Sequence, residues 1–103
     1  MTLPIQFGAT AAVELADAAR WYEERRPGLG HRFVAAVEVT IDSLALWPLA
    51  GTPVGDPDES HHVRRAPVER FPYHVGYLVA EEQIVILAIA HDRRRPHYWS
   101  GRT

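Results

Sequence analysis

The most regular pattern of hydrophobic and polar positions lies in residues 73–90. From Tyr73 to Val79, aromatic and β-branched side chains take every second position, a period typical of a β-strand. Residues 81–83 are polar, and residues 84–90 form a continuous apolar run that is rich in β-branched side chains. We therefore predict two antiparallel strands joined by a hairpin, with the second strand buried on both faces of a sheet.

Two helices are predicted in the N-terminal half of the chain. The first extends from a candidate N-cap at Thr10 to about Arg26, and Glu14 is expected in its first turn, where the helix dipole favours an anion. Residues 27–30 end this helix and start the next one, which ends before Pro48. The second helix carries one apolar stripe, formed by Leu29, Phe33, Val37, Ile41 and Leu44. This pattern indicates a helical hairpin whose apolar faces pack on the sheet.

Two further strands complete the expected sheet. Residues 3–7 alternate apolar and polar side chains, and Pro4 favours an edge position for this strand. Residues 49–60 are rich in glycine, proline and acidic side chains, so they are expected to form an exposed loop. Residues 61–68 are predicted to form a strand that lies at an edge or ends at Pro67. The predicted fold is α+β, with a helical hairpin on one face of a mostly antiparallel sheet (β-α-α-β-β-β) and a short basic C-terminal tail.

Length and composition restrict the class of protein. A chain of 103 residues is expected to form a single domain, residues 1–103, with one core. No apolar run approaches the roughly 20 residues that span a bilayer, and no signal peptide is recognisable, so a cytoplasmic location without membrane contact is expected. The chain has no cysteine, which excludes disulfides, thiolate zinc sites and cysteine nucleophiles.

The net charge of −2 conceals an asymmetry along the chain. Residues 1–59 contain nine acidic residues and four arginines, whereas residues 60–103 contain four acidic residues, seven arginines and five of the six histidines. The basic residues are concentrated in residues 91–99, directly after the predicted buried strand. A basic surface of this kind can bind nucleic acid or an acidic peptide.

Several groups of residues together resemble the RelE/ParE toxins. They are Trp21-Tyr22-Glu23, Pro27-Gly28-Leu29-Gly30 with Phe33, Val63-Arg64-Arg65, Phe71-Pro72-Tyr73 with Val75 and Tyr77, Ile86 to His91, and Arg94 to Trp99 with Arg102. The resemblance covers nearly the whole chain and is closer to the ParE-like branch. It implies the toxin of a type II toxin–antitoxin module, silenced by a small antitoxin. ParE-like members inhibit DNA gyrase, and RelE-like members cleave messenger RNA on the ribosome.

A ribonuclease without metal needs a general base, a general acid and a cation near the phosphate. The residues that can supply these groups are Arg70, His91, Arg94, His97 and Tyr98. Arg70 precedes one predicted strand and the others follow its neighbour, so antiparallel pairing can bring them to the same end of the sheet. The chain has no lysine, unlike RelE-like nucleases, and the acid–base work would fall to His91 or His97.

A larger set of residues is predicted to bind the target or the antitoxin. It consists of Arg64, Arg65, Arg70, Tyr73, Arg93, Arg94, Arg95, Tyr98 and Trp99. Arg64 and Arg65 are adjacent in a strand and point to opposite faces, so at most one is expected to serve a site. Tyr98 and Trp99 are expected to pack the tail onto the helices, and Trp21 and Trp47 are assigned to the core or to helix packing.

No metal site and no cofactor are expected. His61 and His62 are adjacent in a predicted strand, where neighbouring side chains face opposite sides, and no carboxylate lies at ligand spacing. The sequence therefore predicts a ParE-like toxin that binds DNA gyrase through its basic end and forms a hetero-oligomer with a cognate antitoxin. One alternative is a RelE-like endoribonuclease with the ribosome and mRNA as partners. A second is a non-toxic module that acts in antitoxin binding and autoregulation.

Overall fold

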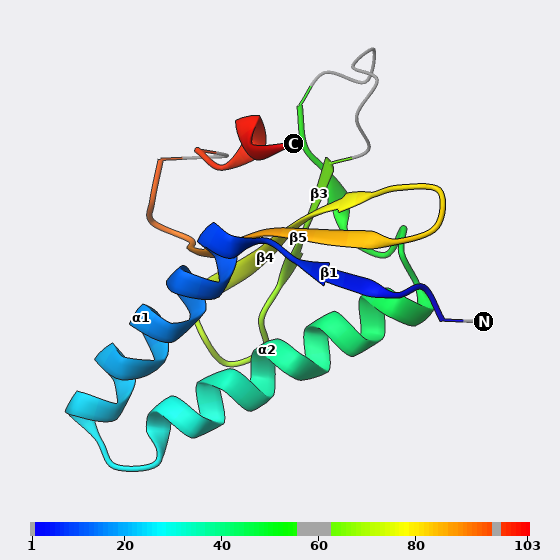
Figure 1. Ribbon diagram of the computed structural model, residues 1–103. Coiled ribbons are helices and arrows are strands. Elements are labelled where there is room, and N and C mark those ends of the chain that lie inside the picture. Colours follow the sequence, from blue (N-terminus) through cyan, green and yellow to red (C-terminus); the bar gives the residue numbers. More distant parts are fainter. Residues whose placement is uncertain (1, 56–62, 96–97) are drawn as a thin grey trace.

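The structure, a computed structural model, describes residues 2–55, 63–95 and 98–103. Its elements are β1 (Ile5–Phe7), α1 (Ala9–Arg25), α2 (Leu29–Leu46), β2 (Thr52–Pro53), β3 (Val63–Pro67), β4 (Tyr73–Val79), β5 (Ile84–His91) and the 3₁₀ helix η1 (Ser100–Arg102). The strands form one sheet in the order β1-β5-β4-β3-β2. Figure 1 shows α1 and α2 on one side of this sheet and η1 on the other. The predicted α+β fold is confirmed, with the short strand β2 as an addition.

The sheet is antiparallel except at one edge. β4 pairs antiparallel with both β3 and β5, as predicted, whereas β1 pairs parallel with β5 through Ile5 and Ile84. β5 carries one extra residue, Leu87, because Gly76 is opposite Ala88 while Tyr77 is opposite Ile86. This bulge places Leu87 and Ala88 together in the core on the far face from the helices. Strand β5 is therefore buried on both faces, as its continuous apolar run predicts.

Helix α1 begins at Ala9, so the prediction that Thr10 is its N-cap is wrong. Gly8 is the residue before the first turn, and its carbonyl accepts a hydrogen bond from the Ala12 N–H at 2.9 Å. The Gly8 N–H also donates to the Ile86 carbonyl at 2.9 Å, and a Cβ at Gly8 would lie only 2.7 Å from that carbonyl oxygen. The helix therefore begins where the chain leaves β1, because only glycine fits so close to β5.

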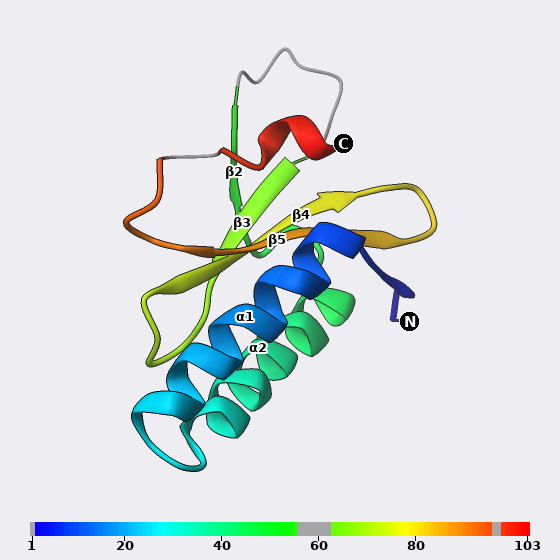
Figure 2. The ribbon, with the colours of Figure 1, turned by 60° about the vertical axis from the view of Figure 1, so that its left-hand side comes forward.

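The helical hairpin packs on the sheet through the predicted stripe of α2. Phe33, Val37, Ile41 and Leu44 are all buried, whereas Leu29 is only partly buried. The ring of Phe33 contacts those of Tyr22, Phe71 and Tyr73, with centroids 4.9–5.2 Å apart. Figure 2 shows α1 and α2 side by side under the sheet. Neither helix is long and apolar enough to cross a membrane in the part of the chain that the structure describes.

A second, smaller core lies on the other face of the sheet. Its buried members are Val54, Val63, Leu87, Ala88, Ala90 and Trp99. Trp99 has no exposed surface, and its ring lies over Gly76, where a Cβ would come within 2.7 Å of three ring atoms. The expectation that Trp99 packs the tail onto the helices is therefore wrong, because the missing side chain at Gly76 opens a place for the indole on the opposite face.

Replacing Tyr77 with phenylalanine should lower the free energy of unfolding by about 1–3 kcal/mol. Tyr77 is fully buried, its hydroxyl donates to the Pro48 carbonyl at 2.8 Å and it accepts from the Gly51 N–H at 2.9 Å. The substitution leaves both backbone groups without these partners. Urea denaturation measures the change, with Tyr22→Phe as the control because the Tyr22 hydroxyl has no hydrogen bond to the described residues. Equal losses in the two variants would contradict the prediction.

Candidate functional site

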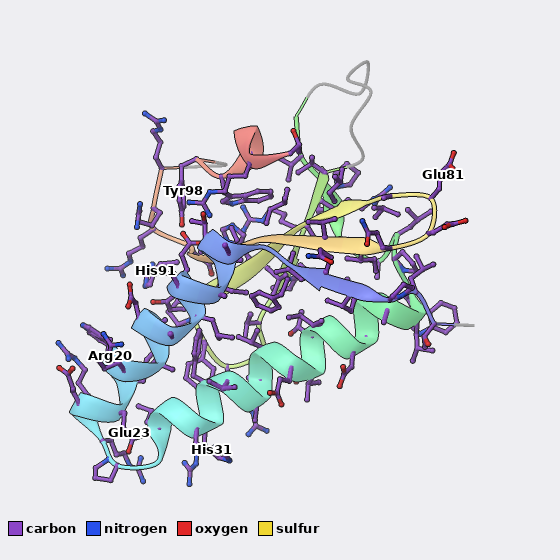
Figure 3. All side chains as sticks on the ribbon, in the orientation of Figure 1. Arg20, Glu23, His31, Glu81, His91 and Tyr98 are labelled. Carbon is purple, nitrogen blue, oxygen red and sulfur yellow. The ribbon has the colours of Figure 1, made fainter. Side chains whose placement is uncertain are left out.

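A groove of about 520 Å³ lies between α1 and the end of the sheet at which β4 begins and β5 ends. The rings of Trp21, Tyr22, Tyr73 and Tyr98 line it. His91 and Arg94 supply its nitrogen groups, and Glu14 and Asp17 supply its carboxylates. Figure 3 shows His91 and Tyr98 on the side of the molecule where α1 meets the C-terminal residues. Aromatic rings next to an arginine are the composition that dominates the energy of protein–protein contacts.

Four residues of the predicted sites meet in this groove: Tyr73, His91, Arg94 and Tyr98. Tyr73 and His91 are directly opposite each other in the antiparallel pair of β4 and β5, and their rings lie 5.0 Å apart. Antiparallel pairing therefore brings His91, Arg94 and Tyr98 to the end of the sheet at which β4 begins. Arg70 lies in the turn between β3 and β4 and is exposed but does not line the groove, and His97 lies outside the described residues.

The adjacent arginines of β3 have separate partners, and neither lines the groove. One guanidinium nitrogen of Arg64 donates to the Gly51 carbonyl at 2.7 Å and to the Leu49 carbonyl at 3.2 Å. A nitrogen of Arg65 lies 3.9 Å from a carboxylate oxygen of Asp92. Arg64 thus holds the loop that follows α2, which is a structural contact.

The three consecutive arginines after β5 differ in their surroundings. The Arg94 guanidinium lies over the Tyr98 ring, 4.4 Å from its centroid, and lines the groove. Arg93 and Arg95 are exposed, and their side chains make no ion pair or hydrogen bond with the described residues. The Arg93 backbone N–H donates to Nδ1 of His91 at 3.0 Å. Arg94 is therefore the arginine of this run that belongs to the groove.

All three tryptophans differ from the sequence-based expectation in their exposure or their position. Trp21 is 50% exposed, lines the groove and has the Arg25 guanidinium 3.6 Å from its ring centroid. Trp47 is 68% exposed, so its assignment to the core is wrong. Trp99 is fully buried, so its side chain is not accessible for the predicted contact with a partner.

Sequence reasoning missed the role of Glu14, which connects α1, β5 and the C-terminal residues. Its carboxylate accepts hydrogen bonds from the Tyr98 hydroxyl at 2.6 Å, from the Ile89 N–H at 3.2 Å and from Arg102 at 2.8 and 3.3 Å. Arg102 also donates to the Leu87 carbonyl at 3.1 Å. The first turn of α1 contains no acidic residue, so the prediction that Glu14 acts there on the helix dipole is wrong. No local pattern reveals partners that lie 75 to 88 positions away.

The Tyr98 phenol holds its proton strongly. Burial, together with the hydrogen bond to Glu14 and the charge of Glu14, raises the pKa of Tyr98 to about 12, although Arg94 and Arg102 act in the opposite direction. The hydrogen bond to Glu14 likewise raises the pKa of Arg102. Near neutral pH, Tyr98 is therefore a hydrogen-bond donor to Glu14 and a packing surface for Arg94.

Tyr98→Phe should change the stability of the protein at alkaline pH. The folded pKa of Tyr98, about 12, lies above the ordinary value of 10.0, so its stabilising contribution is complete below about pH 10 and is lost as the pH rises toward 12. The free energy of unfolding should fall less between these pH values in Tyr98→Phe than in the wild type. The alkaline absorbance titration should also lose the phenol whose pKa is about 12. Tyr22→Phe is the control, and identical alkaline limbs in both variants would contradict the assignment.

The described residues contain no group of three or more histidine and acidic side chains placed to hold a metal ion. His61 and His62 lie outside the described residues.

Two solved structures have a fold similar to that of this chain. The structure is similar to a structure of the chromosomal ParDE TA system from P. aeruginosa, with a TM-score of 0.73 and 22% identity over 87% of this chain and 96% of that one. It is also similar to a structure of the toxin–antitoxin complex RelBE2 from Mycobacterium tuberculosis, with a TM-score of 0.59 and 21% identity over 88% and 99%. These likenesses show that the fold is of the RelE/ParE type.

The sequence identifies the family to which the chain belongs. The profile of the family described as ParE toxin of type II toxin-antitoxin system, parDE, matches residues 5–96. The chain therefore belongs to the ParE toxin family, and the resemblance that the sequence suggested is confirmed. None of the curated protein sequences compared with the chain matches it.

Proposed function

We propose that this ParE-family toxin arrests growth by binding and inhibiting DNA gyrase through the groove and its rim, with Arg94 as the principal polar contact. The family membership carries the proposal. The groove supports it, because Trp21 is half exposed there and the Arg94 guanidinium has no carboxylate partner among the described residues. Exposed rings next to an arginine favour a protein partner that supplies apolar side chains and a carboxylate.

The chemistry of the groove favours binding over RNA cleavage. The Tyr98 hydroxyl donates a hydrogen bond to Glu14 and has a pKa of about 12, so it is poorly suited to transfer a proton near neutral pH. His91 is the remaining acid–base candidate among the described residues that line the groove, and its Nδ1 already accepts a hydrogen bond. The cation predicted at Arg70 lies outside the groove.

A cognate antitoxin is the second partner in this proposal. Solved structures with the same fold include the ParDE TA system and the RelBE2 toxin–antitoxin complex. The antitoxin would place carboxylates against Arg94 or against the exposed Arg93 and Arg95, and the two proteins would form a hetero-oligomer. A toxin that acts on gyrase would work in the cytoplasm, where its target is found.

The test uses the purified toxin in two assays run in parallel. In the first, gyrase, ATP and relaxed plasmid are incubated with the toxin, and supercoiling and cleaved DNA are measured. In the second, a reconstituted translation system receives the same toxin, and peptide synthesis and mRNA integrity are followed. We expect loss of supercoiling, accumulation of cleaved DNA and unchanged translation, with supercoiling restored by the antitoxin.

Three other results would overturn the proposal. Cleaved mRNA together with normal supercoiling would identify the RelE-like nuclease. Normal activity in both assays, from toxin shown to be folded by circular dichroism, would leave the non-toxic partner module. Inhibited supercoiling that the antitoxin does not relieve would contradict the proposed neutralisation.

A further inference from the structure

We propose that Glu14 is a positioning residue of the toxin: it fixes the C-terminal tail, defined as residues 98–103, so that Tyr98, with Arg94 against its ring, forms a wall of the groove. The consequence for gyrase binding rests on the proposed function. The positioning itself is a property of this chain alone and is testable without any partner.

The bonding around Glu14 shows how one carboxylate connects three elements. Glu14 is a residue of α1. Its carboxylate accepts hydrogen bonds from the Ile89 N–H of β5 and from the Tyr98 and Arg102 side chains of the tail. The side chains of Glu14 and Arg102 are 18% and 27% exposed, so solvent screens this ion pair less than a surface pair. The contact is therefore stronger than the surface ion pair of Asp17 and Arg20, which are 65% and 68% exposed at 3.6 Å.

The position of Arg94 follows from that of Tyr98. The hydroxyl of Tyr98 is fixed by Glu14 at 2.6 Å, which sets the direction of the ring. The guanidinium groups of Arg94 and Arg102 lie 4.4 and 5.2 Å from the centroid of this ring. Glu14 thus acts on Arg94 through Tyr98, although Glu14 and Arg94 share no hydrogen bond or ion pair.

A second anchor separates this role from general stability. Trp99 is fully buried on the far face of the sheet, and its indole N–H donates to Nε2 of His74 at 3.1 Å. Loss of Glu14 leaves this anchor in place. We therefore expect the loss of Glu14 to change the positions of the Tyr98 and Arg94 side chains more than it changes the global fold.

The experiment compares Glu14→Ala and Glu14→Gln with the control Glu24→Ala. Glu24 is an exposed carboxylate of the same helix that does not line the groove, so the control changes the charge by the same amount as Glu14→Ala. The first readout is NMR of the Arg94 side chain, whose signals we expect the ring current of Tyr98 to displace. We expect Glu14→Ala to move these signals to the values of a free arginine, Glu14→Gln to give a smaller change, and Glu24→Ala to give none.

Two further readouts follow the tail. Trypsin should cleave after Arg94 faster in Glu14→Ala than in the control, and the alkaline titration of Tyr98 should move from about 12 toward 10. Gyrase inhibition should weaken about ten-fold in Glu14→Ala. In the double variant with Arg94→Ala, the Glu14 substitution should add no further loss, because both changes act through the same group.

The outcomes separate the two proposals. Arg94 signals that stay displaced in a folded Glu14→Ala protein would overturn the positioning role, and so would additive losses of gyrase inhibition. If the wild type does not inhibit gyrase, the proposed function fails, whereas the NMR, proteolysis and titration results still decide the role of Glu14. Should Glu14→Ala not fold, Glu14→Gln decides it, since the amide oxygen still accepts from Ile89 while the ion pair with Arg102 is lost.

Discussion

Replacing Trp99 with alanine should lower the free energy of unfolding by about 3–5 kcal/mol. Trp99 has no exposed surface, fills the core on the far face of the sheet and donates a hydrogen bond to His74. Its removal leaves a cavity beside Leu87, Ala88 and Ala90. Urea denaturation measures the change, with circular dichroism as the signal.

The control for this prediction is Trp47→Ala. Trp47 is 68% exposed, so its loss should cost no more than about 0.5 kcal/mol. A loss below about 1 kcal/mol in Trp99→Ala would show that the tail contributes little to global stability. Gly76→Ala should act in the same direction as Trp99→Ala, since the added methyl group would collide with the indole ring.

Arg94→Ala should weaken gyrase inhibition by about 30-fold, the loss typical of an interface arginine that contributes about 2 kcal/mol. The side chain lines the groove and lies over the Tyr98 ring, and it makes no ion pair with the described residues. The melting temperature should therefore remain within a few degrees of the wild type. Dose–response curves in the supercoiling assay give the inhibitory concentration.

A matched pair of double variants tests whether position or charge matters. Arg94→Ala with Arg95→Ala removes two positive charges and includes the groove residue, whereas Arg93→Ala with Arg95→Ala removes two charges outside the groove. The first pair should weaken toxicity in cells, and the second should reduce inhibition less than about three-fold at physiological salt. Equal losses would indicate that net charge, not contact with Arg94, drives binding. Loss of cooperative unfolding in the first pair would show that these arginines are structural.

Local patterns were sufficient to predict most of the fold. The alternation from Tyr73 and the apolar run to Ala90 predicted β4 and β5 because strand periodicity is a local property. Antiparallel pairing then placed Tyr73 opposite His91 and brought Arg94 and Tyr98 to the same groove. The two-residue strand β2 was not predicted, because it is too short to show a period.

The features that the sequence did not predict depend on contacts between residues that are far apart in the chain. The apolar run of β5 predicted burial on both faces but not the identity of the side chain that covers the second face. Gly76 was the available signal, since a glycine inside an alternating strand often marks a close approach by another group. The exposed position of Trp47 and the bonds of Glu14 follow from tertiary geometry, and neither leaves a pattern in the neighbouring sequence.

The parallel pairing of β1 with β5 has a consequence for the order of events during synthesis. Ile5 of β1 pairs with Ile84 of β5. Strand β1 is translated first, but it cannot join the sheet until most of the chain has left the ribosome. The α1–α2 hairpin consists of neighbouring contacts and can form early, since contacts close in sequence form fastest. At roughly 5–20 residues per second, several seconds separate the translation of Glu14 from that of Tyr98. The groove is thus completed late, and an unfinished chain does not carry the proposed binding surface.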